Sequence, residues 1–129
     1  INLIPKMQKR DVLLIGYGGI SYLLTQAIEK LFNEDIYAEI IVPEQISPLG
    51  DHFLGLILKK NLPVLIVEES TIEFGWGAEI TTRLKENSSL FPIKRLGASQ
   101  DCIPSATHLE NQVLVQVDHI RQAVLNLLM

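Results

Sequence analysis

Residues Val64 to Ile80 read VLIVEESTIEFGWGAEI, and this stretch decides the fold class. It opens with a short apolar run that ends in two adjacent carboxylates, Glu68 and Glu69. A polar loop follows, and a Gly-Trp-Gly block, Gly75 to Gly77, then leads into the opening of a helix. This order is typical of a buried parallel strand, a loop at its carboxyl end and a helix packed close by.

The rest of the chain alternates in the same way, so we expect a three-layer α/β/α domain with a mostly parallel five-stranded sheet. The one strand for which an antiparallel direction is allowed is the short apolar segment Asn2 to Ile4. Asp51 is expected to cap the second helix. Apolar runs predict the other strands, and apolar residues at helical spacing predict the helices: strands at 11–16, 37–42, 63–68 and 92–96, and helices at 20–32, 51–60, 77–86 and 109–128.

Composition limits the function classes. The chain has 129 residues, 47% of them apolar, which fits one domain with one core, and we expect it to be a piece excised from a longer protein because it begins at Ile1. Its net charge is −4 with scattered Lys and Arg, so no nucleic-acid partner is expected. No apolar run is long enough for a membrane span. Cys102 is the single cysteine, which excludes a disulfide framework and favours a reducing, cytoplasmic location.

Candidate catalytic, cofactor-binding and metal-ligating residues give only weak signals. The turn Gly16-Tyr17-Gly18-Gly19 lies where phosphate-binding loops occur, but the dinucleotide pattern requires glycine at position 21, which is Ser21. A tight turn that lets a helix pack closely is the favoured interpretation, and a free-standing anion- or nucleotide-binding module remains the alternative. Ser21 lacks the context of a nucleophile elbow, and the histidines show no metal-ligand spacing: His52, His108 and His119. We assign no catalytic, cofactor or metal residue.

The acid pair and the aromatic loop after it form a candidate interface. Glu68 and Glu69 should point to opposite faces of the sheet. They are interpreted either as acids near a ligand or partner subunit, or as caps of backbone amides in a neighbouring loop or helix. The aromatic residues are interpreted either as exposed anchors of an interface or as rings folded back over the sheet edge. The candidate interface residues are Glu68, Glu69, Phe74, Gly75, Trp76 and Gly77. Another acid, Glu39, lies in mid-strand and is expected to be exposed or paired.

These motifs together resemble the C-terminal domain of thiamine-diphosphate enzymes of the transketolase superfamily. The likeness spans nearly the whole chain, and two blocks favour the beta subunit of the first component of 2-oxo-acid dehydrogenase complexes: Gly-x-Gly-Ala-Glu-Ile at 75–80 and Pro-x-Ala-x-x-Leu-Glu at 104–110. Supporting blocks are the strand DVLLIG with the turn Tyr17-Gly18-Gly19 after it, the acid pair, and Ile120 to Val124. The segment before the last strand is shorter than in the family, only Ser88 to Pro92.

The resemblance implies that the parent enzyme decarboxylates a 2-oxo acid and transfers the acyl group to a lipoyl group. Thiamine diphosphate and magnesium would be bound by other domains or subunits, and none by this one. The domain would support its neighbours, extend a homo- or hetero-oligomer interface and offer a surface to the acyltransferase core, a contact that the short segment at 88–92 puts in question. Alternatives within the superfamily are the C-terminal domain of transketolase or of deoxyxylulose-phosphate synthase.

Overall fold

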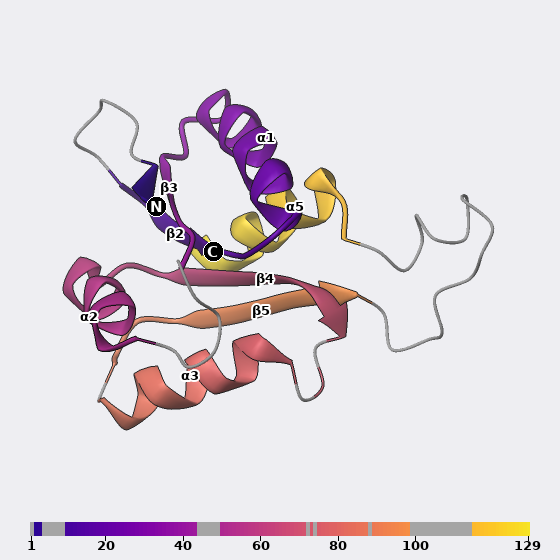
Figure 1. Ribbon diagram of the computed structural model, residues 1–129. Coiled ribbons are helices and arrows are strands. Elements are labelled where there is room, and N and C mark those ends of the chain that lie inside the picture. Colours follow the sequence, from indigo (N-terminus) through magenta and orange to yellow (C-terminus); the bar gives the residue numbers. More distant parts are fainter. Residues whose placement is uncertain are drawn as a thin grey trace.

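A computed structural model of the chain describes residues 2–3, 10–43, 50–71, 73, 75–87, 89–98 and 115–129. The described residues form a five-stranded sheet with the strand order β1-β3-β2-β4-β5 (Figure 1). Two strands in the middle of the sheet, β2 and β4, are built from the apolar runs VLLI and VLIV, whose side chains are fully buried. The strands are β1 (Asn2–Leu3), β2 (Val12–Ile15), β3 (Ala38–Ile41), β4 (Val64–Thr71) and β5 (Ile93–Ala98).

The pairing confirms the predicted sheet. Strand β2 runs parallel to β3, with Leu13 opposite Glu39, and parallel to β4, with Leu13 opposite Val64. Strand β4 runs parallel to β5, with a register shift between Val67 and Thr71. Strand β1 is the antiparallel edge, where Asn2 pairs with Ile41. The antiparallel option left open for the N-terminal segment is therefore the one the chain adopts.

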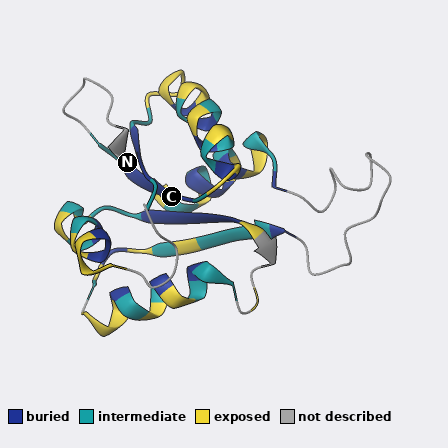
Figure 2. Cartoon of the chain, in the orientation of Figure 1, coloured by how far each residue is buried: buried dark blue, intermediate teal, exposed yellow. Residues whose placement is uncertain are grey.

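Helices cover both faces of the sheet (Figure 1). One core cluster lies between the sheet and helices α1 (Ile20–Phe32) and α5 (Val117–Leu128). The other lies between the sheet and helices α2 (Asp51–Lys60) and α3 (Trp76–Glu86). Successive strand residues alternate between the clusters, because side chains point to opposite faces with a period of two. Figure 2 shows β2, β3 and most of β4 buried between helices that expose their outer faces, whereas β5 at the edge is only partly buried.

Two predicted helix starts and one predicted N-cap were wrong, and two strands run further than predicted: β4 extends to Thr71 instead of 68, and β5 to Ala98 instead of 96. The last helix begins at Val117 and not at 109, with Gln116 as its N-cap in a capping box with His119; residues 109–114 lie outside the described part of the chain. The N-cap of α2 is Gly50, and Asp51 is its first helical residue, where a carboxylate favours the positive end of the helix dipole without capping it. Helix α3 begins at Trp76, one residue before the predicted start at Gly77. No helix among the described residues is both long and apolar enough to span a membrane.

Two exposed ion pairs join α5 to α1 and to the turn that follows α1. Lys30 Nζ lies 2.8 Å from Asp118 Oδ1, and Arg121 Nε donates to Glu34 Oε2 at 2.9 Å. The hydrogen bonds from Arg121 and Lys30 lower the pKa of Glu34 below 4.5 and that of Asp118 below 3.8. Both carboxyls therefore bind protons less readily in the folded chain than in the unfolded chain.

We expect these pairs to make stability depend on pH in the acid range. A lowered carboxyl pKa contributes stability above the unfolded value, and this contribution is lost as the pH falls through the folded value. The thermal midpoint should therefore fall from about pH 5 to pH 3. In Arg121→Met and Lys30→Met the fall should be shallower than in the wild type, whereas Lys85→Met, which removes an exposed lysine elsewhere, should match the wild-type slope. Equal slopes in all four proteins would contradict the assignment.

Candidate functional site

The carboxyl ends of β2 and β4 form the candidate site. From β2 the chain passes through α1 to β3 on one side, and from β3 it returns through α2 to β4 on the other. The gap between β2 and β4 is therefore the topological switch point, where open α/β sheets bind their ligands. Two segments meet there: the turn at 16–19 and the stretch from Glu68 to Gly77.

The acid pair splits across the sheet, which confirms that the two side chains point to opposite faces. Glu68 is fully buried, and its Oε2 lies 2.7 Å from where a Cβ on Gly77 would stand, at the first turn of α3. Glu69 is exposed, and its Oε1 lies 2.6 Å from where a Cβ on Gly19 would stand, at the start of α1. Each carboxylate thus faces the N-terminus of the helix on its own side, where the helix dipole favours negative charge.

The turn at 16–19 is built for close packing. A Cβ on Gly16 would lie 2.8 Å from Ile20, 2.9 Å from Leu24 and 3.3 Å from the carbonyl oxygen of Val67. Gly18 has a φ of +61°, which favours glycine. These contacts support the tight-turn interpretation. They do not favour a phosphate cradle, because an anion at the start of α1 would meet the carboxylate of Glu69. No side-chain hydrogen bond caps α1, so Glu69 acts there as a nearby charge and not as a cap.

Glu68 belongs to a crowded buried layer beside α3. Ile66 pairs with Arg95 of β5, so both side chains share the face of Glu68. A Cβ on Gly77 would lie 3.0 Å from Ile66 and 3.1 Å from Arg95 Cδ, in addition to its 2.7 Å approach to Glu68. Gly77 therefore lets α3 approach the sheet closely over the buried side chain of Glu68.

Gly77→Ala should destabilise the fold by about 1–3 kcal/mol, because the added methyl group must displace a buried carboxylate or a packed side chain. Gly55→Ala is the matched control: nothing lies within 4 Å of a Cβ at this position inside α2. That change should stabilise the protein by up to about 1 kcal/mol through helix propensity. Chemical denaturation of both variants measures the difference. An unchanged midpoint for Gly77→Ala would show that the glycine is not needed for packing.

The aromatic residues of the edge are packed together. The ring of Trp76 lies 4.8 Å from that of Tyr17 in an edge-to-face contact and 6.3 Å from that of Phe53 in a stacked one. Trp76 is half-buried because α3 begins at this residue and turns the ring inward, so of the two interpretations the structure favours a ring folded back over the sheet edge to an exposed interface anchor. Phe74 lies outside the described residues. Phe53, and Tyr17 from the turn at 16–19, were not among the predicted interface residues, and no local signal in the sequence links either ring to Trp76.

A second buried acid, Glu39, lies away from this edge. The prediction of a paired acid is confirmed and that of an exposed one is wrong: Glu39 is fully buried. Its Oε2 lies 3.1 Å from Lys60 Nζ at the end of α2, and its Oε1 lies 3.5 Å from Arg10 Nε, just before β2. The two cations neutralise a charge that could not otherwise be buried at this strand position. This cluster ties α2 and the start of β2 to β3.

Lys60→Met should destabilise the fold by roughly 1–3 kcal/mol, because Glu39 then keeps only one of its two cationic neighbours in a buried position. Lys59→Met removes the adjacent exposed lysine and should change stability by less than about 0.5 kcal/mol. Thermal or urea denaturation compares the two. A cost for Lys59→Met as large as that for Lys60→Met would contradict a specific role for the ion pair.

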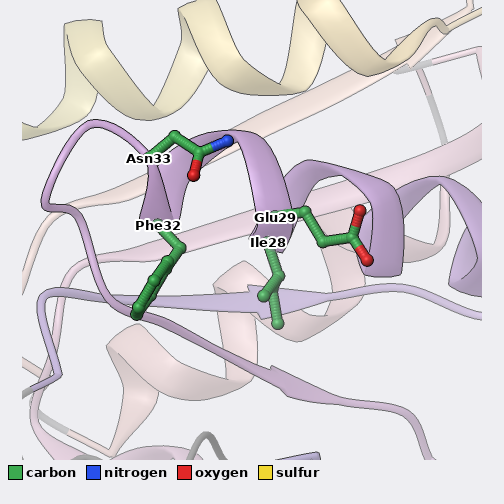
Figure 3. Close-up of a pocket in the computed structure, with 4 residues that line it drawn as sticks. All are labelled: Ile28, Glu29, Phe32 and Asn33. Atoms are coloured by element: carbon green, nitrogen blue, oxygen red, sulfur yellow. The ribbon is translucent and has the colours of Figure 1, made fainter.

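The remaining candidates do not form a chemical centre in the described part of the chain. His52 and His119 are exposed on different helices, and Cys102 and His108 lie outside the described residues. No group of three His, Cys, Asp or Glu residues that could hold a metal occurs among the described residues. A hollow lies on the outer surface of α1 near its C-terminal end, away from the switch point. Figure 3 shows Ile28 and Phe32 extending from the same side of the helix there, beside Glu29 and Asn33.

Comparison with known proteins identifies the family. Residues 4–120 match the family described as transketolase, C-terminal domain. The mitochondrial beta subunit of the pyruvate dehydrogenase E1 component of Dictyostelium discoideum is 32% identical over 117 residues, which is 88% of this chain and 33% of that protein. The 1-deoxy-D-xylulose-5-phosphate synthase of Macrococcus caseolyticus is 31% identical over 93 residues, which is 72% of this chain and 15% of that protein. The chain belongs to the transketolase C-terminal domain family.

A solved structure agrees on the fold. A split-gene transketolase, described as an inactive beta4 tetramer, superposes with a TM-score of 0.81 at 18% identity over 99% of this chain and 42% of that one. The three-layer α/β/α class is thus shared with that structure. The present chain spans about a third or less of the length of the two relatives above.

Proposed function

We propose that this chain is the non-catalytic C-terminal domain of a thiamine-diphosphate-dependent 2-oxo-acid dehydrogenase, of the beta-subunit branch. The observation that carries the proposal is the extent of the likeness to the pyruvate dehydrogenase beta subunit, which covers 88% of this chain against 72% for the synthase. The parent enzyme would oxidatively decarboxylate a 2-oxo acid and pass the acyl group to a lipoyl group. Its cytoplasmic location remains a prediction from the sequence.

The geometry of the switch point supports a role without catalysis. Side chains of this chain lie beyond the carboxyl ends of β2 and β4. Glu69 lies at the start of α1, and the ring of Tyr17 contacts that of Trp76. The diphosphate of the cofactor carries negative charge, so a carboxylate at that helix N-terminus disfavours its binding. We therefore assign thiamine diphosphate and magnesium to other domains of the parent enzyme. When bound there, the cofactor would supply the electron sink for decarboxylation.

The function of the domain itself would be to hold neighbouring domains or subunits of the parent enzyme in place. Two closed core clusters and a helix on each side of β4 make a rigid body that can serve as a support. The switch-point edge, where Glu69 is exposed and Gly75 and Trp76 are half-buried, is the surface that we assign to a neighbour in a homo- or hetero-oligomer. Docking of an acyltransferase core remains a prediction that no described contact supports.

A second function in the same family is that of a deoxyxylulose-phosphate synthase. It is favoured by an identity of 31%, almost equal to that of the beta subunit. The sequence blocks at 75–80 and 104–110 had favoured the beta-subunit branch, yet the overall identities differ by very little. The C-terminal domain of transketolase itself is the third alternative within this family.

An activity assay of the full-length protein separates these functions. With its cofactor, magnesium and the partner subunit of its complex, we expect it to decarboxylate pyruvate or a branched-chain 2-oxo acid and to acylate a lipoyl domain. It should not condense pyruvate with glyceraldehyde 3-phosphate. Formation of the condensation product would assign the chain to the synthase instead.

The non-catalytic assignment has its own measurement. The 129-residue chain, produced alone and shown to be folded by circular dichroism, should give no heat signal for thiamine diphosphate and magnesium above that of buffer. The full-length assembly is the positive control. Micromolar binding by the chain alone would place the cofactor site in this domain and would contradict the non-catalytic assignment.

A further inference from the structure

The first turn of α5 is held by a histidine that accepts a hydrogen bond. The backbone N–H of Gln116, the N-cap, donates to Nδ1 of His119, the third helical residue, at 3.0 Å. An imidazole nitrogen accepts a hydrogen bond only when it carries no proton, so the ring that makes this bond is neutral, with its hydrogen on Nε2. Capping boxes ordinarily have Glu or Gln at this position, whose side-chain oxygen accepts over a wide pH range. His119 can accept only while it is uncharged.

The cap fixes how the chain enters α5. Val115 precedes the N-cap and Ile120 is the fourth helical residue, and both are buried in the same core cluster. These are the two positions of a hydrophobic staple, which sets the angle between a helix and the chain before it. The carbonyl oxygen of Gln116 also accepts from the N–H groups of His119 at 3.0 Å and Ile120 at 3.2 Å. The conformation of Gln116 therefore determines both the first turn of α5 and the position of Val115.

The charged groups around the start of α5 in the described chain form two ion pairs. Asp118, next to His119, would attract a charged imidazole, but its carboxylate lies 2.8 Å from Lys30 Nζ of α1. Glu34, in the turn after α1, accepts from Arg121 of α5. Both carboxylates are thus engaged with a cation, and the positive end of the α5 dipole disfavours a further positive charge at this place. His119 is exposed, so its ring exchanges protons directly with solvent.

We propose that His119 is a pH-sensitive cap, and that protonation of its ring opens the start of α5 while the sheet and the other helices stay folded. The proton adds to Nδ1, which then carries an N–H in place of its lone pair. Two donors would face each other between Gln116 and His119, so this hydrogen bond breaks. Histidine side chains ordinarily change charge between about pH 8 and pH 5. Glu34 and Asp118, whose pKa values are lowered, take up protons only in more acidic solution.

The effect of the proton is local. Val115 loses the direction that the cap gives to the chain, and Asp118, in the same turn, loses its fixed position opposite Lys30. Ala123 and Val124, further along α5, remain buried in the core cluster and keep the rest of the helix in place. Mild acid thus detaches one end of α5 from α1 without unfolding the domain.

Hydrogen exchange of the full-length protein, read by mass spectrometry with residue-level fragmentation, tests this cap. Protection factors, which correct for the intrinsic pH dependence of exchange, should fall about fivefold at the amides of His119 and Ile120 between about pH 7.5 and pH 5.5, the effect of losing a typical cap interaction. The matched amide is that of Ala78, which donates to the carbonyl oxygen of Gly75, the N-cap of α3, at 3.1 Å. Helix α3 has no side-chain cap hydrogen bond, so Ala78 should keep its protection.

Two variants assign the change to His119. His119→Gln supplies an acceptor oxygen that is common at this position of a capping box and does not titrate. In this variant the protection of Ile120 should be the same at both pH values. His52→Gln removes another exposed histidine, in the first turn of α2, and should show the full wild-type fall. Circular dichroism should show both variants folded, since both histidines are exposed.

Three results would overturn the inference: protection at the start of α5 that does not change with pH in the wild type, an equal fall in His119→Gln, or an equal fall at Ala78. The last two would mean that acid loosens the domain through other groups. If His119→Gln did not fold, the wild-type comparison between His119 and Ala78 would decide the question. The proposed function stands or falls separately, because the cap is argued from α5 and its contacts and not from the reaction of the parent enzyme.

Discussion

The close approach of two helices to β4 is the constraint on which the rest of the structure depends. Helix α1 packs on one face of the sheet against Gly16, which follows β2, and α3 packs on the other face through its own residue Gly77, and at both glycines a methyl group would collide with a neighbour. Because strand side chains alternate, the consecutive acids near the carboxyl end of β4, Glu68 and Glu69, point to opposite faces of the sheet. Each lies close to the N-terminus of the helix on its face. The buried acid, Glu68, is part of a packed layer, and the exposed acid, Glu69, keeps contact with solvent beside the start of α1. Strand β4 alone thus places a carboxylate on each side of the switch point.

Much of this could be predicted from the sequence, because the signals are local. Runs such as VLLI and VLIV bury both faces of a strand and therefore predict a parallel sheet, and the spacing of Leu24, Ala27 and Leu31 predicts the inner face of α1. The opposite directions of Glu68 and Glu69 follow from the period of a strand. The family resemblance, carried by short blocks spread along the chain, agrees with the match over residues 4–120.

The features that sequence reasoning missed depend on distant contacts. No local pattern reveals that Trp76 meets Phe53, which comes from a helix 23 positions earlier, or that Glu39 is neutralised by Arg10 and Lys60 from two other elements. Capping also differed from the expectation, because it is decided by geometry: Gly50 and not Asp51 is the N-cap of α2, and Gln116 is the N-cap of a last helix that was expected to begin at 109. Side-chain partners across a sheet are fixed by topology, which local propensity does not encode.

The two-residue strand β1 has a consequence for how this domain avoids unwanted association. Without it, β3 would be an edge strand of almost entirely apolar residues, with a row of unsatisfied amides and carbonyls open to another chain. By running antiparallel, Asn2 and Leu3 occupy part of that row along Ile40 and Ile41. On the opposite edge, the exposed Lys94 of β5 places a charge where a second sheet would have to add. Each of these two features, a reversed strand on one edge and a charge on the other, disfavours the addition of a strand from a neighbouring molecule.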